Sequence, residues 1–358
     1  MNKEYKISFP HVGDYHVPVK YLFSNITNLK IIDPPRITTK TIEIGSKYSP
    51  DFVCTPFKYT LGTMIESIEK GANVLVQAGG GCRYGYYSTL QEQILKDLGY
   101  DIVLINLITA GYTDPIRIYR EIKKVTKINI IKSLYYLFIT KKMVEYMDNI
   151  DDYIRKNIGF ELEKNSFINL KKKMLKSFSK TKGHFDLKRT YKKYLKEFKN
   201  IKINKPNNPI RIAIIGELYT IMEPFSNYYL EEELSSKGIE VTRFTNATYL
   251  LFNKKKEIKK MLKKNKDIKY KMGADASDNV CRTRNLCEQG YDGIIHIKSS
   301  FCTPEIGVMQ IINKICSEYK VPVIFFSFDA NTSEVGIKTR LEAFYDMLEM
   351  RKNKWMDM

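Results

Sequence analysis

The sequence predicts an α/β protein with two Rossmann-like parallel-sheet domains joined by a helical middle segment. Near both ends of the chain, short apolar runs alternate with amphipathic stretches of helical length, a pattern typical of parallel sheets covered by helices. Between about residues 111 and 209 this alternation stops, and apolar residues recur at the three- and four-residue spacing of helices. A chain of 358 residues is long enough for two or three domains, each with its own core.

Residues 1–110 predict an N-terminal α/β domain that carries Cys54 and Cys82. Residues 51–72 are expected to form a short strand, a turn and a helix, and a later helix is expected to end at Gly99. The other expected strands are residues 6–13, 29–33, 73–81 and 101–106, and the other expected helices are residues 17–26, 38–48 and 86–99.

Residues 111–205 predict a helical and strongly basic middle segment, and the Pro- and Asn-rich sequence NKPNNP at 204–209 marks its end. Residues 206–358 restart the alternation and predict a C-terminal α/β domain that carries Cys302 and a long final helix. Its expected strands are residues 210–217, 239–244, 292–297 and 321–329, and its expected helices are residues 224–238, 277–291, 303–319 and 336–352.

The composition bears on whether the chain is a membrane, secreted or nucleic-acid-binding protein. No apolar stretch reaches the roughly 18 residues that a membrane span needs, and MNKEYKISFP lacks the apolar segment of a signal peptide, so we expect a cytoplasmic protein. The net charge of +19 comes almost entirely from residues 171–205 and 254–271, which hold fourteen and ten Lys or Arg against two acidic residues each. We interpret both segments as solvated faces, with an anionic ligand surface and a nucleic-acid interface as alternatives.

Three of the six cysteines share a local pattern. Cys54, Cys82 and Cys302 each follow a short apolar run and open a turn into a helix, in DFVCTPFKY, QAGGGCRYG and KSSFCTPEIG. Ligands of open parallel sheets gather at the carboxyl ends of strands, where helix N-termini favour thiolates, so the three thiols could converge in one crevice. The glycines before Cys82 could turn the chain, cradle a phosphate or leave room for a group bound to sulfur.

The remaining cysteines are expected to be buried. Cys281 and Cys287 lie six residues apart on one expected helix and face different directions, and Cys316 lies among isoleucines on another. Separations of 28 and 220 residues among the first three cysteines match no compact metal motif, so three partly buried thiols stay an alternative to a metal site. Zinc usually takes four ligands, whereas three thiolates suit an iron–sulfur cubane with one iron left open.

Five segments carry a family resemblance: KISFPHVGDYHVPVKYLF, SKYSPDFVCTPFKYTLGTMIESIEKGANVLVQAGGGCRYGYY, GELYTIMEPFSN, IIHIKSSFCTPEIG and FDANTSEVGIKTRLEAFYDML. They resemble the 2-hydroxyacyl-CoA dehydratase family and, within it, the branch labelled activase-related or CoA-substrate-specific enzyme activase. The resemblance covers both α/β zones and is only loose in the helical middle.

The resemblance implies a [4Fe–4S] cluster held by three cysteines, which match Cys54, Cys82 and Cys302 in this chain. It also implies a separate ATP-dependent iron–sulfur activator, which delivers a low-potential electron for radical dehydration, or reduction, of an acyl-CoA. A second homologous subunit or a homodimer mate is a further implied partner. The expected enzyme class is a lyase of anaerobic metabolism, specifically a hydro-lyase, with a related reductase component that acts on an acyl-CoA or another small molecule as the alternative.

Departures from the family pattern keep other functions open. Relatives more often have an acidic residue, a histidine and a glycine where Ala330, Asn331 and Ser333 stand, so these positions are not assigned a catalytic role. The chain contains no phosphate-binding loop of an ATPase, so the label "activase" does not imply ATP hydrolysis here. A non-catalytic iron–sulfur relay or assembly protein and a cluster-free basic nucleic-acid scaffold stay alternatives.

Charged residues near the cysteines are further candidates. Lys58 and Arg83 could offset the charge of a cluster or bind CoA phosphates, with ordinary surface charge as the alternative. Glu305 and Glu334 could carry protons, with structural roles as the alternative. His296 lies in an expected strand and is expected to be a core histidine.

Overall fold

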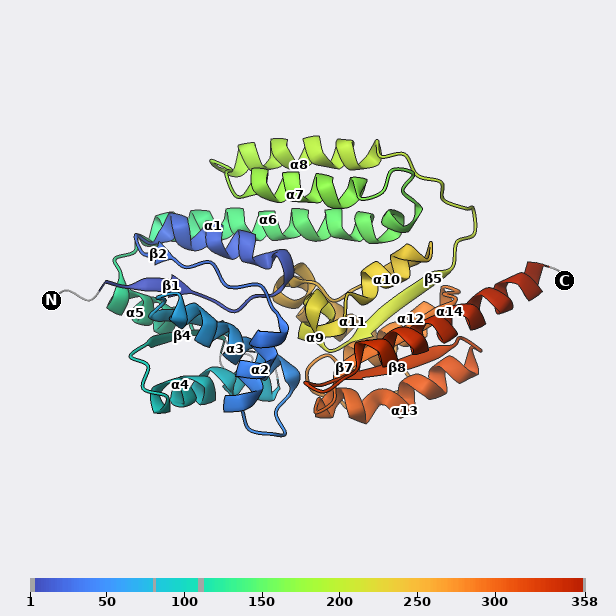
Figure 1. The fold of residues 1–358 in the computed structure, drawn as a ribbon. Coiled ribbons are helices and arrows are strands. Elements are labelled where there is room, and N and C mark those ends of the chain that lie inside the picture. Colours follow the sequence, from blue (N-terminus) through green and yellow to red (C-terminus); the bar gives the residue numbers. More distant parts are fainter. Residues whose placement is uncertain (1–3, 80–81, 109–112, 357–358) are drawn as a thin grey trace. The chain divides into compact units, whose positions relative to one another are not determined.

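The structure is a computed structural model with two parallel β-sheets covered by helices (Figure 1). Each sheet has four strands, and all of its strand pairs are parallel. The predicted α/β class with two Rossmann-like domains is therefore confirmed. The structure describes residues 4–79, 82–108 and 113–356.

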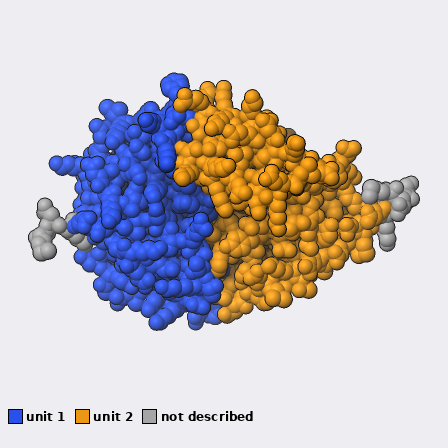
Figure 2. Space-filling model, turned by 45° about the horizontal axis from the view of Figure 1, so that its top comes forward, with its two compact units in different colours: residues 1–144, 178–187 blue, residues 145–177, 188–358 orange. Residues whose placement is uncertain are grey.

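The chain divides into two compact units (Figure 2). Unit 1 comprises residues 1–144 and 178–187, and unit 2 comprises residues 145–177 and 188–358. The helical middle segment is shared between them, since helix α6 Ile130–Asn157 begins in unit 1 and ends in unit 2.

Unit 1 contains a sheet with the strand order β2-β1-β3-β4. Because side chains alternate along a strand, β3 contributes to two cores: Leu75 packs with Phe57 and Leu95 against α3 and α4, whereas Val74 and Val76 pack in a second cluster with α1 and α5. The strands are β1 Lys6–Ser8, β2 Lys30–Ile31, β3 Val74–Ala78 and β4 Val103–Ile108, and the helices are α1 His16–Ile26, α2 Thr39–Tyr48, α3 Thr55–Glu69, α4 Tyr87–Asp97 and α5 Pro115–Val125.

The strand predicted at the start of residues 51–72 is wrong. Residues 49–54 form turns and bends, because they connect two helices that pack backbone to backbone. A Cβ added at Gly45 or Gly62 would lie 1.8 or 2.0 Å from a carbonyl oxygen of the facing helix, so only glycine permits this approach of α2 and α3. Phe52 is exposed in the connection, and its apolar run marks no buried strand.

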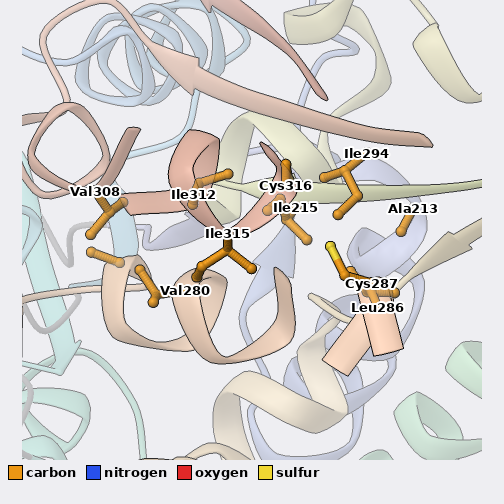
Figure 3. Close-up of a cluster of buried hydrophobic side chains, with 11 residues drawn as sticks. Ala213, Ile215, Val280, Leu286, Cys287, Ile294, Val308, Ile312, Ile315 and Cys316 are labelled. Atoms are coloured by element: carbon orange, nitrogen blue, oxygen red, sulfur yellow. The ribbon is translucent and has the colours of Figure 1, made fainter. Parts of the chain in front are cut away.

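Unit 2 contains a sheet with the strand order β6-β5-β7-β8. Helices α12 and α13 cover one face of β5 and β7, where Ala213, Ile215 and Ile294 pack with Val280 and Ile312 (Figure 3). The strands are β5 Arg211–Gly216, β6 Glu240–Arg243, β7 Gly293–Ser299 and β8 Val323–Phe328, and the helices that accompany them are α9 Leu218–Met222, α10 Leu230–Ser236, α11 Lys254–Lys264, α12 Ala276–Glu288, α13 Thr303–Glu318 and α14 Glu334–Met356.

The single helix predicted over residues 224–238 is also wrong. Tyr228 and Tyr229 adopt left-handed backbone angles, with φ of 54° and 56°, and separate a short 3₁₀ helix from α10. The buried side chain of Asn227 holds this break, because it donates to the Thr220 carbonyl at 2.6 Å and accepts from the first N–H of α10 at 3.0 Å. Helix α11, in the second basic segment, was not assigned from the sequence.

The basic helices of the middle segment have apolar inner faces. Helices α7 Ser166–Phe178 and α8 His184–Lys199 include the buried side chains Phe167, Met174 and Phe198, and the rings of Phe167 and Phe198 lie 6.1 Å apart. Lys172 and Lys173 are exposed beside Met174, which agrees with a solvated basic face. Within the described ranges, no helix is long and apolar enough to cross a membrane.

Candidate functional site

Two of the three predicted ligand cysteines occupy the N-cap positions of helices, although neither side chain makes a capping hydrogen bond. Cys54 is the N-cap of α3 and Cys302 is the N-cap of α13, and each helix has a proline in its first turn. Cys82 lies between β3 and a 3₁₀ helix over Arg83–Tyr86. Helices that cover a parallel sheet begin at the carboxyl edge of its strands, so Cys54 and Cys82 lie at this edge of unit 1 and Cys302 lies at this edge of unit 2.

Topology gives Cys82 and Cys302 equivalent positions in their units. In both sheets the first strand lies between the second and the third, so the strand order reverses between β1 and β3 and between β5 and β7. Ligands of open α/β sheets bind at this switch point, outside the carboxyl ends of the strands. Cys82 follows β3 and Cys302 follows β7, beside the switch point of each sheet.

In unit 1, Tyr87 links the segments of the two cysteines. Its hydroxyl donates to Cys54 Sγ at 2.6 Å, and its ring packs edge-on against Phe57 with the centroids 4.9 Å apart. Cys54 and Cys82 are partly exposed and pack against the same core cluster as Phe57 and Tyr87. Both thiols of this unit therefore border one apolar core, with a hydrogen-bond donor beside Cys54.

In unit 2, a buried polar network ties the first turn of α13 to the sheet. Glu305 and His296 are both 0% exposed, and Glu305 Oε2 lies 2.8 Å from His296 Nε2. Glu305 Oε2 also accepts from Asn279 Nδ2 at 2.8 Å. Asn279 in turn accepts from the N–H of Gly216 at 3.2 Å and donates to its carbonyl at 3.1 Å. The network links the helix capped by Cys302 to β5, β7 and α12, and His296 is the core histidine that was expected.

Lys298 lies on β7 close to this network and is only 4% exposed. Burial lowers the pKa of Lys298, and electrostatic interactions with Cys302 and Glu305 oppose this effect. The described residues offer its ammonium no hydrogen bond and no ion pair. A buried cation without a partner is rare, because its desolvation is not compensated.

A second group of ionisable side chains lies where β5 ends. Glu217 accepts from two backbone N–H groups of α9 at 2.9 Å each, and burial raises the pKa of Glu217 to about 7. Burial also raises the pKa of Asp278 to about 6, against the opposing effect of Lys254. The hydroxyl of Tyr249 donates to Asp278. These contacts cap α9 and join α12 to the segment before α11.

The remaining predicted site residues belong to different elements of the chain. Lys58 is half-buried on α3. Glu334 opens α14, is exposed and pairs with Lys338 at 2.9 Å. The side chain of Arg83 and the glycines at 80–81 lie outside the described residues.

The backbone packing of unit 1 requires a glycine at Gly79, the first glycine of the GGG run. A Cβ at this position would lie 2.3 Å from the carbonyl oxygen of Ile108 and 3.0 Å from Gly85 Cα. Glycine therefore lets the end of β3 pass close to β4 and to the turn after Cys82. Backbone packing explains this glycine without a ligand.

The other three cysteines are buried, as predicted. Cys281, Cys287 and Cys316 are each at most 6% exposed, and the last two lie in the core drawn in Figure 3. A hydrogen bond between the thiols lowers the pKa of Cys287 and raises that of Cys316. This pair is accounted for by packing.

The predicted metal ligands belong to both units, Cys54 and Cys82 to unit 1 and Cys302 to unit 2. Among the residues that the structure describes, no three Cys, His, Asp or Glu side chains form a group that could hold a metal ion. The set of Cys54, Cys82 and Cys302 therefore stays a prediction. The donors nevertheless suit an iron–sulfur cluster, because all three are thiols, two of them stand at helix N-termini without a capping hydrogen bond, and the ammonium of Lys298 interacts electrostatically with one of them.

A cavity of about 540 Å³ lies in unit 1 between α4, β4 and α5. Its polar lining includes Ser88, Asn106, Asp114 and Arg117. None of the predicted site residues lines it, so it carries no part of the argument for the cysteines.

The sequence of this chain matches the model of a known protein family. Residues 139–348 match the model of the 2-hydroxyglutaryl-CoA dehydratase D-component family, which is more than half of the chain. The chain belongs to this family. The expected relationship to 2-hydroxyacyl-CoA dehydratases is thereby confirmed, and the activase-related branch stays a prediction. Comparison with curated proteins gave no match.

The family match covers only one of the three predicted ligand cysteines. It includes Cys302 and most of the helical middle segment, which was expected to resemble the family only loosely. It does not include Cys54 and Cys82, so the assignment of these two cysteines depends on their own motifs and on their place at the sheet edge.

Sequence reasoning missed Asn279 and Lys298. A lysine inside the apolar run IIHIKSS was a usable signal for Lys298, since lysine is almost never fully buried without a partner. Asn279 gave no local signal, because its partners lie 63 and 26 residues away in the chain.

Proposed function

We propose that this chain is the iron–sulfur subunit of a 2-hydroxyacyl-CoA dehydratase, with Cys54, Cys82 and Cys302 as the ligands of one [4Fe–4S] cluster. Family membership supports a dehydratase component. The observation that carries the ligand assignment is the position of Cys302, which caps α13 beside the switch point of its sheet and within the matched residues. The equivalent place of Cys82 in unit 1 supports a shared role.

A bound cluster of this kind would supply one-electron chemistry at low potential. Such chemistry suits a 2-hydroxyacyl thioester, because loss of an α-hydroxyl and a β-proton has the wrong polarity for ordinary acid–base elimination. We propose that the electron comes from a separate ATP-dependent iron–sulfur activator and that a second homologous subunit or a second copy of this chain completes the enzyme. The expected location is the cytoplasm, where thiols stay reduced.

The residues of the chain would prepare the site in three ways. The N-termini of α3 and α13 favour the thiolate form of Cys54 and Cys302. The Tyr87 hydroxyl donates to Cys54, and the apolar core around Tyr87 keeps water from that side of the sulfur. Glu305 is fully buried and bonded to His296, a placement that favours positioning of the Cys302 helix over proton transfer.

The decisive experiment separates cluster binding from catalysis. The full chain is purified anaerobically, reduced, and studied by electron paramagnetic resonance. It is then assayed with activator, ATP and (R)-2-hydroxyglutaryl-CoA or other (R)-2-hydroxyacyl-CoA thioesters, alone and with candidate second subunits. A cubane signal together with water elimination supports the proposal. A cubane signal without turnover under any of these conditions favours an electron-relay protein, and a protein that never holds a cluster contradicts the proposal.

A further inference from the structure

One face of β7 is apolar near the amino end of the strand and polar toward its carboxyl end. Ile294, His296 and Lys298 point to the same side of the sheet, because side chains alternate along a strand. Ile294 lies in the apolar core beneath α12 and α13 (Figure 3), and His296 contacts Glu305. Lys298 is the next member of the row, roughly 7 Å farther toward the carboxyl edge at about 3.3 Å per residue.

Helix α13 places Cys302 above the end of this row. Cys302 is the N-cap and Glu305 is the third residue of the helix, and side chains at these two positions lie on the same side of a helix start. Glu305 reaches His296, so Cys302, one turn earlier, lies toward Lys298. The electrostatic interaction between Cys302 and Lys298 agrees with this placement.

Within the described residues, the carboxylate of Glu305 forms no ion pair with Lys298. Its Oε2 is occupied by His296 and Asn279, while its Oε1 is buried without a hydrogen-bond partner. By contrast, the half-buried Lys254 of the same unit bonds Asp275. The described residues therefore leave the Lys298 ammonium unpaired beside a thiol, which is costly unless an anion occupies the space next to it.

We infer that Lys298 is the charge partner of the iron–sulfur cluster that Cys302 ligates, and that its ammonium raises the reduction potential of that cluster. This inference rests on the proposed function. A cubane held by three thiolates is an anion, and it gains a further negative charge when it accepts an electron. A cation held nearby in a low-dielectric setting stabilises the reduced form more than the oxidised form.

The test compares four forms of the full chain, reconstituted anaerobically with iron and sulfide: wild type, Lys298→Met, Lys298→Arg and Lys352→Met. Methionine keeps the length of the side chain and removes its charge, and arginine keeps the charge. Lys352 is the matched control, because it is half-buried and pairs with Asp292, which directly precedes the amino end of β7. Iron and sulfide are quantified first. The midpoint potential is then measured by electron paramagnetic resonance during titration with dithionite, which reduces each cluster by one electron.

We expect equal cluster content and a more negative midpoint potential in Lys298→Met, with Lys298→Arg and Lys352→Met near wild type. Loss of the cluster in Lys298→Met with retention in Lys298→Arg also supports a charge partner. An unchanged potential in Lys298→Met, or equal cluster loss in both Lys298 variants, overturns the inference. A wild-type chain that holds no cluster instead refutes the proposed function. Without iron, Lys298→Met should melt at a higher temperature than wild type, because the uncompensated buried charge is gone.

Discussion

Replacing Asn279 with alanine tests the network that holds the Cys302 helix. Asn279 is 1% exposed and its side chain makes three hydrogen bonds, two to the backbone of Gly216 and one to Glu305. Alanine removes all three and leaves the N–H and carbonyl of Gly216 without this partner. The first turn of α13 also loses its link to β5 and α12.

The expected loss follows from the buried groups left behind. Each unsatisfied buried polar group costs about 1–3 kcal/mol, so we expect Asn279→Ala to lower the free energy of unfolding of unit 2 by roughly 3 kcal/mol. For a unit of this size, about 1 kcal/mol shifts the melting temperature by roughly 2–4 °C. The thermal transition of unit 2 should therefore fall by about 6–12 °C.

Asn285→Ala is the matched control, because Asn285 is exposed on the same helix. Calorimetry of the full chain gives the melting temperatures, and hydrogen exchange reports the protection of the Gly216 amide. The reasoning is refuted if Asn279→Ala melts within about 1 °C of Asn285→Ala, or if the Gly216 amide exchanges as slowly as in the wild type.

Two further predictions concern the cores of the two units. Burial raises the pKa of Glu217 to about 7 from an ordinary value of 4.5, so the folded state favours the protonated carboxyl. The resulting stabilisation, roughly 3 kcal/mol, is complete below about pH 4.5 and is lost as the pH rises through 7. Glu217→Gln keeps an acceptor oxygen and cannot ionise, so its urea midpoint should decline less between pH 5 and 8 than that of the wild type; parallel declines would contradict this. Phe57→Ala should destabilise unit 1 by about 3–5 kcal/mol, because Phe57 is fully buried against Tyr87, whereas Phe52→Ala should stay within about 0.5 kcal/mol because Phe52 is 75% exposed. Equal shifts of the two variants in urea unfolding would show that the burial argument is wrong.

Elements with a strong local period could be predicted from the sequence. The apolar run of β5, the isoleucine-rich β7, and the ends of α4 and α10 before Gly99 and Gly238 could be predicted from local sequence, and both glycines adopt positive φ. The two errors arose where distant contacts overrode local preference. The apolar run at the start of residues 51–72 connects two helices that pack closely at Gly45 and Gly62, and it forms no strand. The hydrogen bonds of Asn227 interrupt the helix that the periodicity of residues 224–238 predicts.

The candidate site likewise contains positions that the local sequence predicts and positions that depend on distant contacts. The position of Cys302 at the start of α13 is a local property, because a turn residue before Thr-Pro at the end of an apolar run predicts a helix N-terminus. The roles of Asn279 and Lys298 are not local, since they depend on the strand order that brings β5 beside β7 and on the register of α13 over that sheet. Only the folded chain defines those neighbours.

Iron and acid-labile sulfide per chain, measured after anaerobic reconstitution, test the central claim most directly. The account predicts about four of each in the wild type, as a cubane requires, and in Cys281→Ala, since Cys281 is buried in α12 and is not a proposed ligand. It predicts loss of most iron in Cys54→Ser, Cys82→Ser and Cys302→Ser. Retention of a full cluster in Cys302→Ser, or absence of iron from the wild type, would contradict it.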